Sequence, residues 1–384
     1  MKITISINGR FHFFDLIKSL SSKNIISCIF TTYPKIITDR WDFPNVKIKR
    51  FIVLEAFKRI FGYFKLTRKI EFVSKYIFGK YVKHSLPKKF DILIFFAGNG
   101  WHSPVIKRSG NFISIADEGS SHINYHRKIL NEEYDLCNCK NRPYFNDRIV
   151  NQTLLEYKYS DRIVVPSTFV KNTFINEGIP EDKLFVNPYG VDTDNFKQIS
   201  KSDNVFRIIT SGGATIQKGF HYLLEAFYKL KIQNSELWHL GKVHSGMLPY
   251  IKKFNRKGLI FKGHIPQHDL YKYYSQGNIF ALMSIQDGFG MVLVQAMSCG
   301  LPIITTVNTG GPDLITKNGN QGFILNIRDV DGLIENITYI YENNLSYEMG
   351  QSAKLRVSQG YTWEDYGNRY YNFIHKLYHD EQYK

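Results

Sequence analysis

Short apolar runs alternate with longer amphipathic stretches along the whole chain. The short runs are rich in Ile, Val and Phe and are bounded by Gly, Pro, Asn or Asp, which is typical of buried strands. The stretches between them repeat apolar residues every three or four positions, as helices do. This alternation predicts an α/β protein with parallel sheets wrapped by helices. We expect strands at Ile3–Ile7, Ile25–Thr31, Asp91–Phe96, Phe112–Ala116, Arg162–Val165 and Leu184–Val186, and then at Val205–Thr210, Leu237–Leu240, Leu259–Phe261, Ile279–Met283, Pro302–Thr305 and Gly322–Leu325.

The predicted elements form two series separated by a segment rich in turn residues. A chain of 384 residues exceeds what one hydrophobic core usually supports. We therefore predict an N-terminal domain at residues 1–187, a linker at 188–204 and a C-terminal domain at 205–361. Residues 362–384 follow the second domain, and Trp363–Tyr383 reads as an amphipathic helix.

The stretch from Asp287 to Thr306 carries the clearest chemical signal. A glycine-flanked loop leads into a helix at about Gly290–Cys299, and a glycine and a proline then precede a buried strand. Free backbone N–H groups and the positive end of the helix dipole favour phosphate oxygens there. Asp287 and Gln295, eight residues apart, are placed to hold sugar hydroxyls beside the phosphates, so the pattern predicts a nucleotide-sugar site. The expected donor-binding residues in the loop and first turn are Gly288, Phe289, Gly290, Met291 and Val292.

Five ordered blocks within about Asp161–Phe323 make the C-terminal half resemble the donor domain of glycosyltransferase family 4. They are Tyr159–Val170, Asn187–Asp192, Gly212–Gly219 with Tyr222–Phe227, Asp287–Thr305 and Gly310–Ile315. The segment Gly9–Asp15 is similar to the family's first β–α loop. The resemblance implies a GT-B fold, in which two Rossmann-like domains face a cleft and a C-terminal helix crosses back to the N-terminal domain.

The resemblance also implies roles for donor-site residues. Lys218, after the Gly212-Gly213 turn, would neutralise the donor diphosphate. Asp287 would act in catalysis by holding the donor sugar, and Gln295 would grip the ribose. The family usually carries glutamate at both of these positions. It also often carries an arginine shortly before the lysine, where this chain has glycines.

In the N-terminal half, the resemblance places a catalytic histidine after the strand that ends at Ala116. His122 is the candidate, and its alternative role is structural. Asp117 and Glu118 in the same loop are alternatives for an acceptor-binding carboxylate. Gly9 and Arg10 are expected in an acceptor or phosphate loop, where Arg10 would replace the missing cation.

Neither a metal ion nor a cofactor is expected. The four cysteines include Cys137-Asn-Cys139 but no second pair, which favours reduced thiols over a zinc site. Asp192-Thr-Asp194 has the spacing of a metal-binding carboxylate pair but lies in the linker, where aspartates form turns. We expect a nucleotide-sugar co-substrate, a UDP-sugar, and metal-independent transfer.

The net charge of +16 is concentrated in one segment of the N-terminal half. Lys47–Lys89 contains thirteen Lys and Arg, two acids and nine interleaved aromatic residues. If Phe57–Lys83 is a helix bent at Gly62, the cations fall on one broad arc that suits an anionic membrane surface. The alternative is a solvated helix face. Nucleic acid is not expected as a partner, because no binding motif accompanies the charge.

The resemblance to glycosyltransferase family 4 implies a retaining glycosyltransferase. It would move a hexosyl group from a nucleotide sugar to a glycan or lipid-linked acceptor in cell-envelope or capsular polysaccharide synthesis. The alternative is an inactive homologue that serves as a sugar- or membrane-binding subunit. No apolar run approaches the roughly 18 residues of a transmembrane helix, and the first residues read as a strand rather than a signal peptide. We therefore expect a cytoplasmic protein at the inner face of the membrane.

Overall fold

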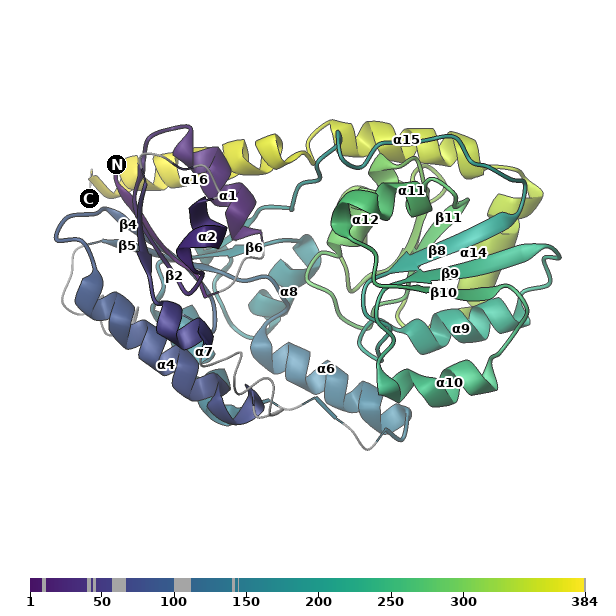
Figure 1. The fold of residues 1–384 in the computed structure, drawn as a ribbon, viewed down its shortest axis with the longest axis horizontal. Helices are drawn as coiled ribbons and strands as arrows, with labels where there is room; N and C mark the ends of the chain where they lie inside the picture. Colours follow the sequence, from purple (N-terminus) through teal and green to yellow (C-terminus); the bar gives the residue numbers. More distant parts are fainter. Residues whose placement is uncertain are drawn as a thin grey trace.

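The computed structural model describes residues 1–8, 12–39, 43, 46–56, 67–99, 112–139, 142–143 and 145–382. Two separate sheets, in which every strand pair is parallel, form the centres of two α/β units (Figure 1). The first sheet has the order β3-β2-β1-β4-β5-β6-β7, and the second has the order β10-β9-β8-β11-β12-β13. The predicted fold class is confirmed.

The strands of the first sheet are β1 (Ile3–Ser6), β2 (Ile26–Thr31), β3 (Lys47–Arg50), β4 (Ile92–Phe96), β5 (Ile113–Asp117), β6 (Arg162–Val165) and β7 (Leu184–Val186). Those of the second are β8 (Phe206–Ser211), β9 (Ser235–Leu240), β10 (Leu259–Gly263), β11 (Ile279–Leu282), β12 (Ile303–Thr306) and β13 (Gly322–Leu325). Residues 187–205 between them contain no helix or strand.

Helices cover both sheets (Figure 1). In the N-terminal part they are α1 (Phe13–Ser21), α2 (Lys35–Thr38), α4 (Thr67–Ser85), α6 (Ile123–Leu136), α7 (Asp147–Tyr159) and α8 (Thr168–Asn176). Later in the chain they are α9 (Phe220–Lys229), α10 (Leu248–Lys253), α11 (Leu270–Tyr274), α12 (Met291–Ser298), α13 (Gly311–Leu314), α14 (Val330–Glu342), α15 (Ser346–Ser358) and α16 (Trp363–Gln382). None of the helices that the structure describes combines the length and apolarity needed to cross a membrane.

The strand β3 was not predicted, because its Lys-Ile-Lys-Arg sequence lacks the apolar run of a buried strand. It lies at the edge of its sheet, where charged side chains reach solvent and discourage pairing with other chains. Apart from β3, each observed strand matches a predicted one, with differences of one or two residues at the ends.

The basic aromatic segment differs from the predicted arc. Residues 57–66, which include three of the thirteen cations of this segment (Lys58, Arg59 and Lys65), lie outside the described residues. In the described part, Phe78 is fully buried, and Phe51 and Tyr81 stack on each other against the same core cluster. These three rings are therefore turned toward the core, whereas Phe72 and Tyr76 are half-buried and stack on each other. Among the side chains of α4 that the structure describes, the exposed apolar ones are Val73 and Ile77.

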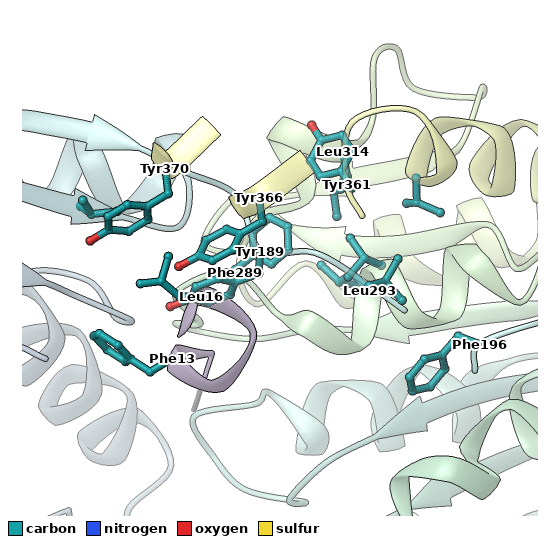
Figure 2. Close-up of a cluster of buried hydrophobic side chains, with 14 of the residues drawn as sticks. Phe13, Leu16, Tyr189, Phe196, Phe289, Leu293, Leu314, Tyr361, Tyr366 and Tyr370 are labelled. Carbon is teal, nitrogen blue, oxygen red and sulfur yellow. The ribbon is translucent and has the colours of Figure 1, made fainter. Parts of the chain in front are cut away.

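One hydrophobic core passes from the first α/β unit to the second (Figure 2). Tyr189 of the linker packs edge-on against Phe289 and Tyr366, with ring centroids 5.7 and 6.0 Å away. Helix α16 returns to the first unit and packs on α1, so closely that a Cβ at Gly367 would fall 1.8 Å from Ser19 Oγ. The C-terminal helix therefore crosses back to the N-terminal domain, as expected.

Replacing the buried ring of Tyr370 tests how much the packing of α16 on the N-terminal domain contributes to stability. Tyr370 is 0% exposed on α16. We expect Tyr370→Ala to lower the free energy of unfolding by about 3–5 kcal/mol, because it removes a fully packed ring. Tyr347→Ala is the control, since Tyr347 is 74% exposed on α15. Its effect should stay within about 0.5 kcal/mol in denaturant titrations. Equal, small effects of both changes would show that α16 is not part of the common core.

Candidate active site

The loop between β11 and α12 lies directly on the N-terminal domain. A Cβ at Gly288 would fall 2.0 Å from the backbone oxygen of Gly119, so only glycine fits between the two backbones. Ser167 Oγ donates a 2.6 Å hydrogen bond to the backbone oxygen of Gly288. The loop expected to bind phosphate is thus held by contacts from both domains.

The first turn of α12 is built as an anion site requires. Gly290 precedes the helix with φ +78°, a left-handed conformation that glycine adopts at little cost. Phe289 is buried beneath the loop, and Gly310 is too close to its ring to carry a side chain. Met291 and Val292 open the helix, and the N–H groups of a first turn have no partner within their own helix. The positive end of the α12 dipole therefore lies at the loop that the sequence predicted to bind phosphate.

Lys218 and Asp287 form an ion pair at this loop. Lys218 is 31% and Asp287 16% exposed, so the pair is partly screened by solvent. The turn before α9 brings Lys218 there, because Gly219 is left-handed and packs against the backbone oxygen of Met283. Lys218, predicted to bind the diphosphate, and Asp287, predicted to hold the sugar, therefore neutralise each other's charge in this structure.

A hydrogen-bonded chain crosses the domain interface beside this pair. Gln217 Nε2 donates to Gln286 Oε1 at 2.9 Å, and Gln286 Nε2 donates to Ser120 Oγ at 2.9 Å. Ser120 Oγ lies 3.3 Å from Nδ1 of His126. Nε2 of His126 is buried without a hydrogen-bond partner among the described residues.

His126 was missed in the sequence, although it lies four residues after the predicted His122. Burial, and then the positive charge of Lys218, lower the pKa of His126 to about 4. A neutral imidazole with a buried, unpartnered Nε2 therefore lies on the N-terminal side of the interface, close enough for the charges of Lys218 and Asp287 to affect its pKa. Helical spacing was the signal in the sequence that could have identified His126, because it lies four residues after His122 and residues four apart lie on one helix face.

His122 itself has the contacts of a helix cap. Its Nδ1 accepts a hydrogen bond from the backbone N–H of Asn124 at 3.3 Å. Its ring packs against Tyr157 and Phe174, with both centroids 5.0 Å away. Burial lowers the pKa of His122 to about 4. The geometry gives it the structural role that was the alternative, and the catalytic prediction gains no support from its position.

The two acceptor carboxylates are also turned inward. Asp117 Oδ1 pairs with His12 Nε2 at 2.7 Å, and both side chains are buried. Glu118 accepts a hydrogen bond from the hydroxyl of Tyr157, and burial raises its pKa to about 7. These residues organise the end of β5, and their acceptor role stays a prediction. Gly9 and Arg10 lie outside the described residues.

Gln295 lies on α12 beneath the Gly212-Gly213 turn. The hydroxyl of Tyr274 is 3.5 Å from Gln295 Oε1 and 2.6 Å from Ser211 Oγ. Ser211 ends β8 and directly precedes Gly212, which has φ +103°. Gln295 is only 7% exposed, so a neutral amide suits this hydroxyl-lined position.

The pKa of His126 provides a direct test of the site geometry. In NMR titrations its imidazole should titrate near pH 4 in the unmodified chain, well below the ordinary value of about 6.5. Lys218→Ala should raise this pKa, because it removes a nearby positive charge and leaves the carboxylate of Asp287 unpaired. Lys242→Ala, a change to an exposed lysine, should leave it unchanged. A value near 6.5 in the unmodified chain would contradict the buried position of His126.

Solved structures share this fold along essentially the whole chain. Sucrose-phosphate synthase from Thermosynechococcus elongatus superposes with a TM-score of 0.77 at 17% identity, over 99% of this chain and 100% of that one. The Anabaena protein HepE, crystallised with UDP, gives 0.71 at 14% identity, over 98% and 100%. These likenesses show the fold.

Curated relatives match part of the chain. A probable sucrose-phosphate synthase of Thermosipho melanesiensis is 32% identical over 209 residues, 51% of this chain and 48% of the relative. The O-antigen chain mannosyltransferase B of Escherichia coli is 27% identical over 156 residues, 39% of this chain and 40% of the relative. The matches thus span less than half the length of either relative. The family model for glycosyl transferases group 1 matches residues 191–356. The C-terminal region of this chain is therefore similar to the glycosyl transferases group 1 family, and the whole chain has the two-domain GT-B fold.

Proposed function

We propose that this protein is a retaining glycosyltransferase that moves a hexosyl group from a UDP-sugar to a glycan or lipid-linked acceptor. The observation that carries the proposal is the Lys218–Asp287 pair at the start of α12. It places a cation and a hydroxyl-binding carboxylate beside a helix N-terminus, which is the combination that a sugar diphosphate needs.

The donor would bind by separating this pair. The diphosphate oxygens would take the ammonium of Lys218 and the N–H groups of the first turn of α12. Asp287 would then accept hydrogen bonds from hydroxyls of the donor sugar. Because these groups meet the phosphate charge, we propose transfer without a divalent ion at the diphosphate.

The opposite domain would supply a neutral hydrogen-bonding group. His126 faces the pair across the interface, and Nε2 is its unused nitrogen. As a neutral imidazole it would hold a sugar hydroxyl without adding charge to the transition state. The leaving phosphate would accept the acceptor's proton on the face it leaves, which gives retention. The protein's contribution would be positioning and charge stabilisation.

Relatives support the chemical class of the substrates. The matches include a capsular polysaccharide biosynthesis glycosyltransferase of Staphylococcus aureus, 27% identical over 169 residues. HepE was also crystallised with UDP-glucose. We therefore propose a role in cell-envelope or capsular polysaccharide synthesis with a UDP-sugar donor.

We further propose that the N-terminal domain touches an anionic membrane through α4. Val73 and Ile77 are 49% and 40% exposed and share one helix face with the exposed Lys80. Val53, 69% exposed, is next to Leu54, which packs against Phe78 of α4 in a common cluster. Aliphatic side chains with adjacent lysines suit an interface between headgroups and acyl chains. This surface would bring the protein to a lipid-linked acceptor.

The split of roles between Lys218 and Asp287 is testable by calorimetry and turnover. Lys218→Ala should weaken UDP and UDP-sugar binding by roughly ten- to a hundredfold, because a charged hydrogen bond contributes about 1.5–3 kcal/mol. Asp287→Asn should retain or raise the affinity for UDP, since it releases Lys218, while it lowers sugar transfer. Gln295→Ala should weaken both ligands alike through the ribose. An unchanged dissociation constant in Lys218→Ala would place the phosphates elsewhere.

The same assays separate an enzyme from an inactive subunit. The double change Asp287→Glu with Gln295→Glu restores the residues usual in the family. If only this variant transfers sugar across a broad donor panel, and the unmodified chain binds donors without turnover, the protein is a binding subunit. Transfer by the unmodified chain supports the proposed enzyme.

Vesicle sedimentation tests the membrane surface. The protein should bind anionic but not neutral vesicles, and added salt should weaken the binding. Replacing Lys80 and Lys83 by Gln together with Val73 and Ile77 by Ser should abolish it, because each cation near such a surface contributes about 1 kcal/mol. Lys252→Gln with Lys253→Gln, on α10 of the other domain, is the charge-matched control. Equal binding by both variants would contradict the assignment to α4.

A further inference from the structure

Three potential metal ligands meet where α6 of the N-terminal domain touches α9 of the C-terminal domain. Glu133 and Cys137 are four residues apart at the end of α6, so they lie on one helix face. His221 comes from the first turn of α9, 84 residues after Cys137. All three ligand atoms lie within 4.8 Å of one another.

The distances match a known coordination geometry. His221 Nε2 lies 3.0 Å from Glu133 Oε1 and 3.5 Å from Cys137 Sγ. Cys137 Sγ lies 3.9 Å from Glu133 Oε1. Around a tetrahedral zinc ion with bonds of about 2.0–2.3 Å, neighbouring ligand atoms are about 3.3–3.6 Å apart. Small side-chain adjustments would bring all three atoms to bonding distance of one ion.

A second layer of contacts holds the carboxylate in position. Glu133 is 0% exposed, and its Oε2 accepts a 2.7 Å hydrogen bond from Nε of Arg328. Arg328 also pairs with Glu132 at 2.8 Å. Tyr222 also hydrogen-bonds this carboxylate, and Oε1 is the oxygen that faces His221 and Cys137. Such outer contacts are a regular feature of metal sites.

We propose that Glu133, Cys137 and His221 bind a zinc ion that joins the two domains. A carboxylate, a thiolate and an imidazole are ligands that zinc accepts together. Binding would release the thiol proton of Cys137 to solvent. A cavity of about 700 Å³, lined by Cys137, Cys139, His244 and Tyr250, reaches the cluster at Cys137 and would give the ion a path from solvent.

This zinc would be structural and apart from the proposed sugar transfer. His221 lies three residues after Lys218, so the ion would hold α6 against the start of α9 next to the donor loop. Zinc would thereby favour the arrangement in which His126 faces the Lys218–Asp287 pair. The site could not be predicted from spacing in the sequence, because its third ligand, His221, lies in the other domain.

Metal analysis of the full chain tests the proposal. Protein purified under reducing conditions and supplied with zinc should retain about one ion per chain after desalting. Cobalt in its place should show a thiolate charge-transfer band and tetrahedral d–d bands. Zinc should raise the melting temperature of the metal-free protein, and magnesium should not. A metal-free chain that takes up no zinc and shows no shift in melting overturns the proposal without any variant.

Variants identify the ligands. Cys137→Ser and His221→Gln should each weaken zinc binding by more than about tenfold in competition with a chelating indicator. His244→Gln is the matched control, because His244 lines the same cavity but is not in the cluster. It should bind zinc like the unmodified protein. If Cys137→Ser and His221→Gln, folded by circular dichroism, bind zinc as tightly as that control, the ion is elsewhere and the proposal is wrong.

Discussion

The relative position of the two domains is fixed by a close contact between two glycine backbones and by the aromatic core next to it. Gly288 approaches Gly119 too closely for any side chain at this position. Behind this contact, Phe289 packs against Tyr189 of the linker, whose ring stacks 4.5 Å from that of His12. Rings that contribute to one core cannot move independently without losing packing energy. The loop that opens α12 is therefore placed by the interface as much as by its own domain.

Charge at the site follows from this placement. Because the loop lies on the N-terminal domain, Lys218 and Asp287 are both partly shielded from water and pair with each other. The same shielding keeps His126 neutral, since burial and the adjacent ammonium both disfavour a second positive charge. Burial also explains the neutral side chain of Gln295. A charged glutamate at this buried position would lie beside the hydroxyl of Tyr274, which also hydrogen-bonds Ser211, and burying its charge would cost free energy.

Sequence alone predicted every described strand except β3, and it placed a loop and a helix where the structure has the loop before α12. Strand β11 is a continuous apolar run, and every residue of β8 is buried, because both faces of a parallel sheet are covered. The edge strand β3 lacks that signal, since charge suits an edge. The Lys218–Asp287 pair could not be predicted, because it joins residues 69 positions apart through tertiary packing. His122 was singled out because it follows the strand β5, and His126 was missed, because only the side-chain environment on α6 distinguishes the two histidines.

Helix α6 connects these features (Figure 1). It begins in the N-terminal domain with the cap at His122 and extends to the second domain, where Glu133 contacts His221 and Arg328. Between its ends, His126 reaches the chain of contacts to Gln286. His126, Glu133 and Cys137 are spaced by seven and four residues, so one face of a single rigid helix presents all three to the C-terminal domain. Any movement of α6 at the Glu133 end must therefore also move the histidine that faces the donor loop. The domain contact and the site chemistry are thus mechanically coupled.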